Sequence, residues 1–155
     1  MVCVHQIFSQ DEMRELSKTA LSLSLNFVER SENIHNVSTM YLGPPWIDHF
    51  SNKVMARAEE IYTLKLQRFR DFLLKYEVGG KADVHQDSHS IDGGISTVTL
   101  IHKTDDLQGG NVIAEGVEYP QQVGDTIFYG AHTLHGVTEV TRGSRLVLIG
   151  WYAKQ

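Results

Sequence analysis

Cysteine, long apolar runs and excess positive charge are all scarce in this chain of 155 residues. The single cysteine, Cys3, cannot form a disulfide within the chain and cannot supply the several thiolates of a zinc cage. No apolar run approaches the ~20 residues that a membrane-spanning helix needs. The N-terminus also lacks the basic segment and following apolar stretch of a secretory signal. These absences predict a cytoplasmic protein without a membrane partner.

The charge balance is acidic, with a formal net charge of -5. An acidic surface argues against nucleic acid as a partner, although it leaves room for a local basic groove. The hydrophobic fraction of 41% and the aromatic fraction of 9% are typical of a globular chain that buries a core. We therefore expect one domain over residues 1–155, without internal repeats or a long linker.

The first part of the chain carries two helical patterns. Ser9 and Glu12 have the spacing of a capping box, in which each side chain accepts a hydrogen bond from the other residue's backbone amide. The helix that they open is expected to run to about Leu25. A second helix is predicted to start at Pro44-Pro45 and to end near Gln67, because apolar residues recur along one helical face. These residues are Trp46, Phe50, Val54, Ile61 and Leu64.

From Phe69 onward, the apolar spacing changes from the helical repeat to the two-residue alternation of strands. Glycine-rich steps separate the strands, and Gly79-Gly80 is interpreted as a turn. Two helices followed by several short strands predict a mainly β fold with N-terminal helices and a double-stranded β-helix core, the jelly roll of cupin-like proteins. Residues 1–68 would form the helical cover and residues 69–155 the jelly-roll core. The later strands are predicted at residues 95–102, 111–114, 126–129, 134–137 and 145–152.

The triplet His85-Gln86-Asp87 is the first candidate for a functional site. In an extended segment alternate side chains leave on the same face, so His85 and Asp87 would point together. One more imidazole would complete a triad of two histidines and one carboxylate, which suits Fe(II) and leaves three coordination positions open. Taken alone, such a triplet is more often a surface histidine near a solvated aspartate.

A second candidate lies at the start of the last predicted strand. Arg145 follows His135 by ten residues and shares its strand face with Val147, Ile149 and Trp151. This apolar face would draw the guanidinium into the interior, where a buried charge needs an anionic partner. A bound carboxylate matches the guanidinium fork. The alternative is an arginine at an exposed strand end, paired with Glu139 or with water.

Taken together, these segments resemble the Fe(II)/2-oxoglutarate dioxygenases, and among them the prolyl-4-hydroxylase-like branch. The resemblance covers residues 70–153. The order of the segments is more specific than any one of them. They are Tyr76, His85-Gln86-Asp87, Gly109-Gly110, Gly124-Asp125, His135-Gly136-Val137, Gly143-Ser144-Arg145 and Trp151.

The resemblance implies a cofactor set and a set of site residues. Fe(II) would be the metal, 2-oxoglutarate and O2 the cosubstrates, and ascorbate a reductant. Arg145 would hold the distal carboxylate of 2-oxoglutarate, and the hydroxyl of Tyr76 would support the cosubstrate. Trp151 is similar to a late-strand aromatic of the family's pocket, and a plain core tryptophan is an equally good interpretation. The implied iron ligands are His85, Asp87 and His135.

One position and one three-residue run depart from the family pattern. Ala82 stands where members often carry a second tyrosine, and Ile101-His102-Lys103 replaces a Tyr-Leu-Asn-like run. Thr97 and Thr99 are predicted to face inward and to supply a hydroxyl instead.

Three further histidines are interpreted as lying outside the metal site. His89 and His132 are expected at its rim, since a strand geometry would turn His132 away from the face of His135. His102 is expected to be structural or exposed.

The implied function is a hydroxylase that couples oxidative decarboxylation of 2-oxoglutarate to C–H hydroxylation, with a peptidyl proline as the first target. The presence of Asp87 favours hydroxylation, because related halogenases lack the carboxylate ligand. One alternative is the same chemistry on a free amino acid, a small metabolite or a nucleobase. Another is a non-catalytic, cupin-like metal-binding module. The expected partner is thus a peptide, a protein or a small molecule.

Overall fold

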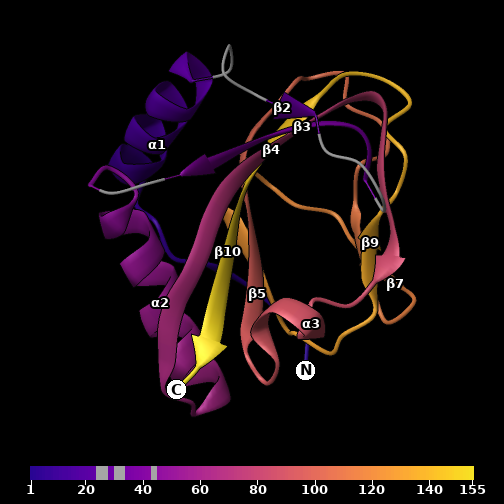
Figure 1. Cartoon of the computed structure of the whole chain (residues 1–155). Coiled ribbons are helices and arrows are strands. Elements are labelled where there is room, and N and C mark those ends of the chain that lie inside the picture. The colour runs from indigo at the N-terminus through magenta and orange to yellow at the C-terminus, as the bar shows by residue number, and fades with distance from the viewer. Residues whose placement is uncertain (24–27, 30–33, 43–44) are drawn as a thin grey trace.

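A computed structural model describes residues 1–23, 28–29, 34–42 and 45–155. It has one curled antiparallel sheet, and helices α1 (Gln10–Ser22) and α2 (Asp48–Tyr62) cover one of its faces (Figure 1). The predicted mainly β fold with N-terminal helices and a jelly-roll core is confirmed. No helix in these residues is long and apolar enough to span a membrane.

Helix α1 begins as the capping box predicts. Ser9 Oγ accepts a hydrogen bond from the Glu12 amide at 3.1 Å, and Glu12 Oε1 accepts one from the Ser9 amide at 2.9 Å. Leu16 and Ala20 are fully buried and fix the inward face of the helix. The helix ends at Ser22, and the predicted extension to Leu25 leads into residues 24–27, which lie outside the described part of the chain.

Helix α2 is shorter than predicted. Its predicted start at Pro44 lies outside the described residues, and the predicted end near Gln67 is wrong, because the helix ends at Tyr62. Thr63 has left-handed backbone angles, which stop the helix. Leu64 still packs against the core from the connection to the next strand. Its spacing from the apolar residues of α2 therefore matched a further helical turn, although no such turn forms.

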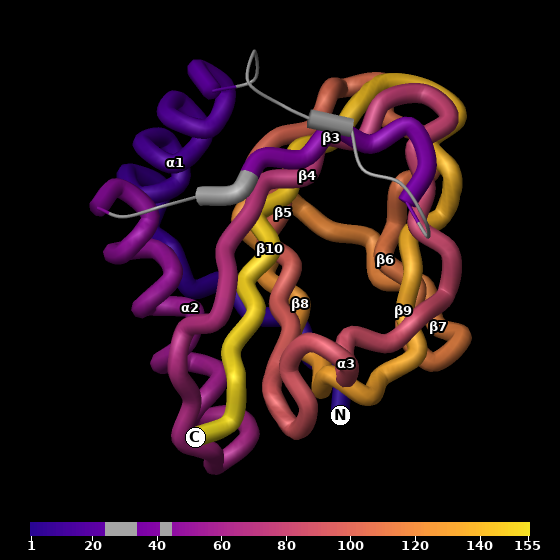
Figure 2. Tube along the Cα trace, in the orientation of Figure 1, coloured from indigo at the N-terminus to yellow at the C-terminus, as the bar shows by residue number. Residues whose placement is uncertain are grey.

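The strands pair in the order β1-β8-β5-β10-β4-β9-β6-β7, and β3 joins the other edge of β4 and pairs with β2. Figure 2 shows β6, β7 and β9 facing the side formed by β4, β5, β8 and β10. A short helix, α3 (Ser88–Ile91), connects β4 to β5. The strands are β1 (Cys3–Gln6), β2 (Val28–Glu29), β3 (Ile34–Leu42), β4 (Leu66–His85), β5 (Ile95–Lys103), β6 (Val112–Ala114), β7 (Val117–Tyr119), β8 (Asp125–Gly130), β9 (His135–Val137) and β10 (Arg145–Lys154).

Strand β4 belongs to both sides of the jelly roll. It pairs with β10 from Leu66 to Tyr76 and with β9 from Ala82 to His85. The predicted turn at Gly79-Gly80 is wrong, because the strand continues through both glycines. Gly79 has a φ of 87°, a conformation that favours glycine, so the pair bends the strand without reversing it.

The sheet separates two packed layers. Side chains on its inner face form the apolar wall of the barrel, and those on its outer face pack under the helices. The inner residues include Leu74, Val98, Leu100, Val147 and Ile149; the outer ones include Leu73, Ile101, Leu146 and Leu148.

We predict that Glu12 stabilises the contact between α1 and α2. Its carboxylate accepts hydrogen bonds from Lys53 Nζ at 2.8 and 3.0 Å and from the Ser9 amide, and it pairs with His49. The Lys53 contact, together with the Ser9 amide and His49, lowers the pKa of Glu12 from 4.5 to about 2. The carboxylate therefore stabilises the fold above its ordinary pKa, and this contribution is lost as the pH falls through the folded pKa.

The variant Glu12→Gln should therefore unfold at a lower urea concentration than the wild type at pH 7. The difference should shrink as the pH falls below 4.5 toward about 2. Glu15→Gln, an exposed change on the same helix, is the control. Equal sensitivity of the two variants at neutral pH would contradict this role of Glu12.

Candidate metal centre

The pairing of β4 with β9 brings two histidines side by side. His85 ends β4 and lies opposite His135, the first residue of β9, with ring centroids 4.4 Å apart. A register irregularity between Ala82 and His85 changes the alternation of β4. Val84 is therefore 60% exposed, whereas His85 lines a cavity inside the barrel.

Asp87 completes the cluster from just beyond the end of β4. It precedes α3 with φ near −101° and ψ near 4°. The sequence suggested that the whole triplet is extended, but the backbone leaves the extended conformation at Asp87. Asp87 Oδ1 lies 3.5 Å from His85 Nε2, and Asp87 Oδ2 lies 3.4 Å from His135 Nε2. One donor atom from each residue falls within 4.8 Å of the other two. The structure thus brings all three predicted ligands together.

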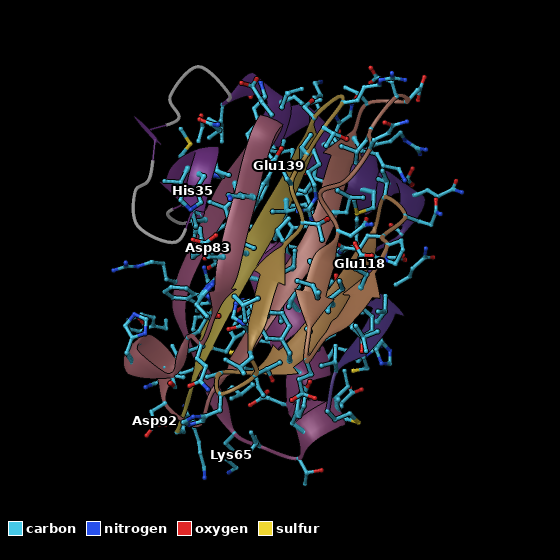
Figure 3. All side chains as sticks on the ribbon, turned by 90° about the vertical axis from the view of Figure 1, so that its right-hand side faces the viewer. His35, Lys65, Asp83, Asp92, Glu118 and Glu139 are labelled. Carbon is cyan, nitrogen blue, oxygen red and sulfur yellow. The ribbon has the colours of Figure 1, made fainter. Side chains whose placement is uncertain are left out.

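Backbone carbonyls orient both imidazoles in the same way. His85 Nδ1 lies 2.6 Å from the Asp83 carbonyl, and His135 Nδ1 lies 2.9 Å from the Thr133 carbonyl. A carbonyl can only accept, so each Nδ1 carries the proton and each Nε2 offers a lone pair to the cluster. The Asp83 carboxylate also pairs with His35 of β3 at 2.9 Å, on the face seen in Figure 3. This pair ties β3 to the segment that orients His85.

The electrostatics of the cluster suit a cation. Burial opposes ionisation of Asp87, but the hydrogen bond with His85, the nearby His135 and the hydroxyl of Ser96 hold the pKa of Asp87 below its usual range. Ser96 Oγ donates to Asp87 Oδ2 at 2.7 Å. Burial lowers the pKa of His135, which favours the neutral ring. An ionised carboxylate and neutral imidazoles are the protonation states that metal ligands require.

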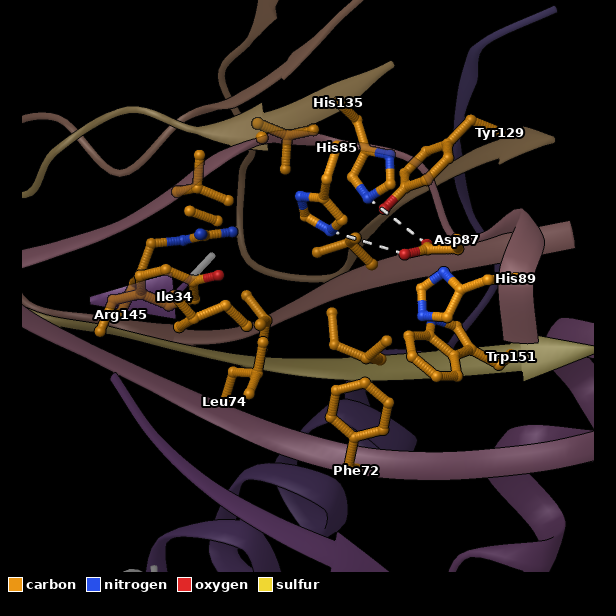
Figure 4. A pocket seen from close by; sticks show the side chains of 18 residues that line it. Ile34, Phe72, Leu74, His85, Asp87, His89, Tyr129, His135, Arg145 and Trp151 are labelled. Atoms are coloured by element: carbon orange, nitrogen blue, oxygen red, sulfur yellow. Dashed lines mark ion pairs between the residues drawn. The ribbon is translucent and has the colours of Figure 1, made fainter. Parts of the chain in front are cut away.

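A cavity of about 110 Å³ extends from the cluster into the barrel. Figure 4 shows Arg145 on one side of it and His89 and Trp151 on the other, with His85 and His135 between them. Arg145 is only 2% exposed, as the apolar strand face predicts. The alternative of an exposed arginine at the strand end is therefore wrong.

The guanidinium of Arg145 carries a buried charge without an acidic partner among the described residues. Its Nη2 donates to Gln121 Oε1 at 3.1 Å, and its Nη1 has no hydrogen-bond partner there. Burial lowers the pKa of Arg145. The ring of Tyr76 lies beside the guanidinium, with its centroid 4.9 Å from Cζ. An anionic ligand in the cavity would pair with this buried charge and would be stabilised by it.

Several other predicted residues lie elsewhere. Thr97 and Thr99 do not face the cavity, because their hydroxyls bond to the Gly150 carbonyl and to Thr126, and Val98 lines the cavity instead. The inward prediction for both threonines is therefore wrong. His132 is exposed, pairs with Asp92 at 2.6 Å and is not among the residues that line the cavity.

His102 is half-buried and is not among the residues of this cavity. His89 is exposed but lines the cavity edge, and Trp151 lines it while stacking on Phe69 with ring centroids 6.4 Å apart. Both therefore form part of the cavity wall, and the exposure of His89 agrees with its predicted place at the rim.

Sequence reasoning missed three residues that contact the site. Ser96 bonds to Asp87, Gln121 bonds to Arg145, and the buried ring of Tyr129 lies 4.4 Å from the ring of His135. Correct assignment of the inward face of β5 would have indicated Ser96, which shares its face with Val98. Gln121 lies between strands, where no periodicity marks an inward side chain.

A family model described as the 2OG-Fe(II) oxygenase superfamily matches residues 72–153, more than half of the chain. The chain belongs to the 2OG-Fe(II) oxygenase superfamily. The match contains the whole histidine–aspartate cluster and Arg145. The superfamily's name implies Fe(II) and 2-oxoglutarate, and both suit the ligand cluster and the buried guanidinium.

Curated relatives of this oxygenase are PKHD-type hydroxylases. One from Hyphomonas neptunium is 37% identical over 90 residues, which are 50% of this chain and 40% of the relative. Another from Idiomarina loihiensis is 32% identical over 84 residues, 50% of this chain and 38% of the relative. The chain thus spans about two fifths of the length of these relatives.

Solved structures share the oxygenase fold over nearly the whole chain. A Pseudomonas putida prolyl-4-hydroxylase aligns with a TM-score of 0.79 at 18% identity, over 99% of this chain and 92% of that one. The non-heme alpha ketoglutarate dependent epimerase SnoN from nogalamycin biosynthesis aligns with a TM-score of 0.84 at 16% identity, over 97% and 76%. At these identities the likeness establishes the fold.

We predict that the cluster binds a divalent metal and that Ser96 tunes the binding. Asp87→Ala should weaken Mn(II) binding by more than about a hundredfold, and Ser96→Ala, which removes one hydrogen bond to that carboxylate, by roughly tenfold. Titration calorimetry under anaerobic conditions measures both. His132→Ala, three residues before His135, is the control and should bind like the wild type. Unchanged affinity in Asp87→Ala would remove that residue from the metal site.

Proposed function

We propose that this chain is an Fe(II)- and 2-oxoglutarate-dependent hydroxylase. His85, Asp87 and His135 hold the iron, and Arg145 and Tyr76 hold 2-oxoglutarate. The observation that carries this proposal is that the ligand cluster and a buried guanidinium, which has no acidic partner among the described residues, line the same small cavity. Residues 1–155 act as one domain, since α1 and α2 complete the core on the outer face of the sheet.

Each site residue has a defined task in this proposal. When bound, Fe(II) with 2-oxoglutarate and O2 supplies oxidative decarboxylation coupled to C–H hydroxylation. The two imidazoles donate through Nε2, and Asp87 supplies the negative ligand that Ser96 keeps in place. Three protein ligands leave the remaining coordination positions open for small molecules. Ascorbate serves as the reductant that keeps the iron ferrous.

Arg145 selects the cosubstrate by its far end. Its Nη1, which has no hydrogen-bond partner in the described part of the chain, and the planar fork of the guanidinium suit a carboxylate, and the apolar surroundings strengthen such a contact. Tyr76 is buried beside the guanidinium and lines the same cavity, so its hydroxyl supports the same carboxylate. The apolar side chains of Leu74, Val147 and Ile149 keep water out.

The proposed substrate is a peptidyl proline. Trp151 at the cavity and the 48% exposed Phe69 stacked on it offer an aromatic surface for a proline ring. The curated relatives are hydroxylases, and a Trichoplax adhaerens prolyl hydroxylase solved with a peptide fragment shares the fold with a TM-score of 0.79. A small-molecule substrate is the second candidate, because SnoN shares the fold equally well.

The first test is turnover of 2-oxoglutarate. We expect the Fe(II) protein with ascorbate to form succinate, and His85→Ala to abolish this activity while circular dichroism shows the fold unchanged. Metal binding without any succinate, across the substrates tried, would favour a non-catalytic module. Mass spectrometry for the gain of one oxygen atom on proline-containing peptides and on small metabolites then separates the two substrate classes.

The role of Arg145 has its own test. Arg145→Ala should raise the KM for 2-oxoglutarate by about a hundredfold, because a charge-assisted contact in a buried site is lost, and should leave Mn(II) affinity unchanged. Arg142→Ala removes the same charge from an exposed position three residues earlier and should leave the KM as it is. An unaltered KM in Arg145→Ala would remove this residue from cosubstrate binding.

A further inference from the structure

The amide of Gln121 is held in one orientation. Its Nε2 donates to the Val98 carbonyl at 3.0 Å and to the Asp125 carbonyl at 2.9 Å, so both amide hydrogens are used. Its backbone carbonyl accepts from Lys103 Nζ at 3.2 Å, and only 8% of the residue is exposed. The remaining amide oxygen must therefore face Arg145 Nη2, which lies 3.1 Å away.

Arg145 is confined on its other sides. A side chain at Gly110 would begin 2.8 Å from Arg145 Cδ, so only glycine leaves room for the stem of the arginine. The ring of Tyr76 flanks the guanidinium, and β10 pairs with β4 and β5 through the Arg145 backbone. With Nη2 fixed by Gln121, the plane of the guanidinium is set and Nη1 remains for another acceptor.

The acceptor that fixes Arg145 is neutral. A buried arginine is usually paired with a carboxylate, which would cancel its charge and compete with any anionic ligand. An amide oxygen accepts one hydrogen bond and leaves the positive charge in place. Among the described residues, no aspartate or glutamate carboxylate forms an ion pair with Arg145. Gln121 therefore orients the guanidinium without neutralising its positive charge.

We propose that Gln121 is a positioning residue that reserves Arg145 for a dicarboxylate. Its neutral amide orients the guanidinium, and its lack of charge makes the site prefer a 2-oxo acid with a second carboxylate over one with an apolar end. This inference rests on the proposed function, since it assigns a residue to cosubstrate selection.

The test compares two ligands on the Mn(II)-loaded protein by anaerobic calorimetry, without turnover. 2-Oxoglutarate and 2-oxopentanoate share the 2-oxo acid group and chain length, but only the first has a distal carboxylate. Gln121→Glu places a carboxylate against Arg145, so 2-oxoglutarate affinity should fall roughly tenfold to a hundredfold. The affinity for 2-oxopentanoate, measured by competition, should stay within about threefold. Gln122→Glu makes the same change on the exposed neighbouring side chain and should alter neither affinity.

Two further variants keep the result interpretable. In an Arg145→Gln background, Gln121→Glu should have no additional effect on 2-oxoglutarate, because its target charge is gone. Gln121→Met removes the hydrogen-bond acceptor of Arg145 without adding charge. This variant should lower 2-oxoglutarate affinity several-fold and keep the preference for the diacid. If Gln121→Glu does not fold, the Gln121→Met result alone decides whether Gln121 positions Arg145.

The outcomes separate the two proposals. Wild-type affinity for 2-oxoglutarate in both Gln121 variants, or an equal loss for both ligands in Gln121→Glu, would overturn the role of Gln121 alone. Wild-type protein that binds Mn(II) but shows no preference for 2-oxoglutarate over 2-oxopentanoate would overturn the proposed cosubstrate, and this inference with it.

Discussion

The pairing of β4 with two different strands, β10 and then β9, along the edge opposite β3 is the constraint on which the site depends. Its first part pairs with β10 and places Tyr76 opposite Arg145, and its end pairs with β9 and places His85 opposite His135. The bend at Gly79-Gly80 lets one strand serve both sides of the barrel. The two histidines of the candidate metal centre and the buried guanidinium are therefore positioned by one continuous strand rather than by loops.

The cavity between the ligand cluster and Arg145 carries opposite charges at its two sides. Asp87 is ionised at one side, where Ser96 and two imidazoles support the negative charge, and Arg145 is positive at the other, where no described acid neutralises it. Between them the wall is made of aliphatic and aromatic side chains. The two sides of the cavity therefore suit a ligand with an acidic group at each end, as the proposed function requires, because the low polarity of the wall strengthens electrostatic contacts.

Much of this arrangement could be predicted from the sequence, and the failures have local physical causes. The alternation of β10 is regular from Arg145 to Trp151, so burial of Arg145 followed directly from its apolar neighbours. The alternation of β4 changes at the irregularity before His85, and the face of Thr97 was assigned wrongly because β5 is buried on both sides. Both faces of such a strand look alike in sequence.

The remaining misses concern single backbone angles and side chains in connections. Thr63 ends α2 with left-handed backbone angles, which cannot be predicted from a threonine. Gln121 points inward from a connection that has no periodic pattern. The order of the ligand residues along the chain nevertheless predicted the site correctly, because local irregularities do not change that order. The sheet aligns the end of β4 with the start of β9, and this brings the two histidines together.

The carbonyl bonds that orient the two imidazoles come from the residue two positions earlier in each case, Asp83 for His85 and Thr133 for His135. Each ring is therefore aligned by its own stretch of main chain, whatever side chains surround it. The aromatic and aliphatic side chains that line the cavity can therefore change without removing the hydrogen bonds that orient the two imidazoles. The orientation of the two candidate ligands is in this way independent of the shape of the cavity in front of them.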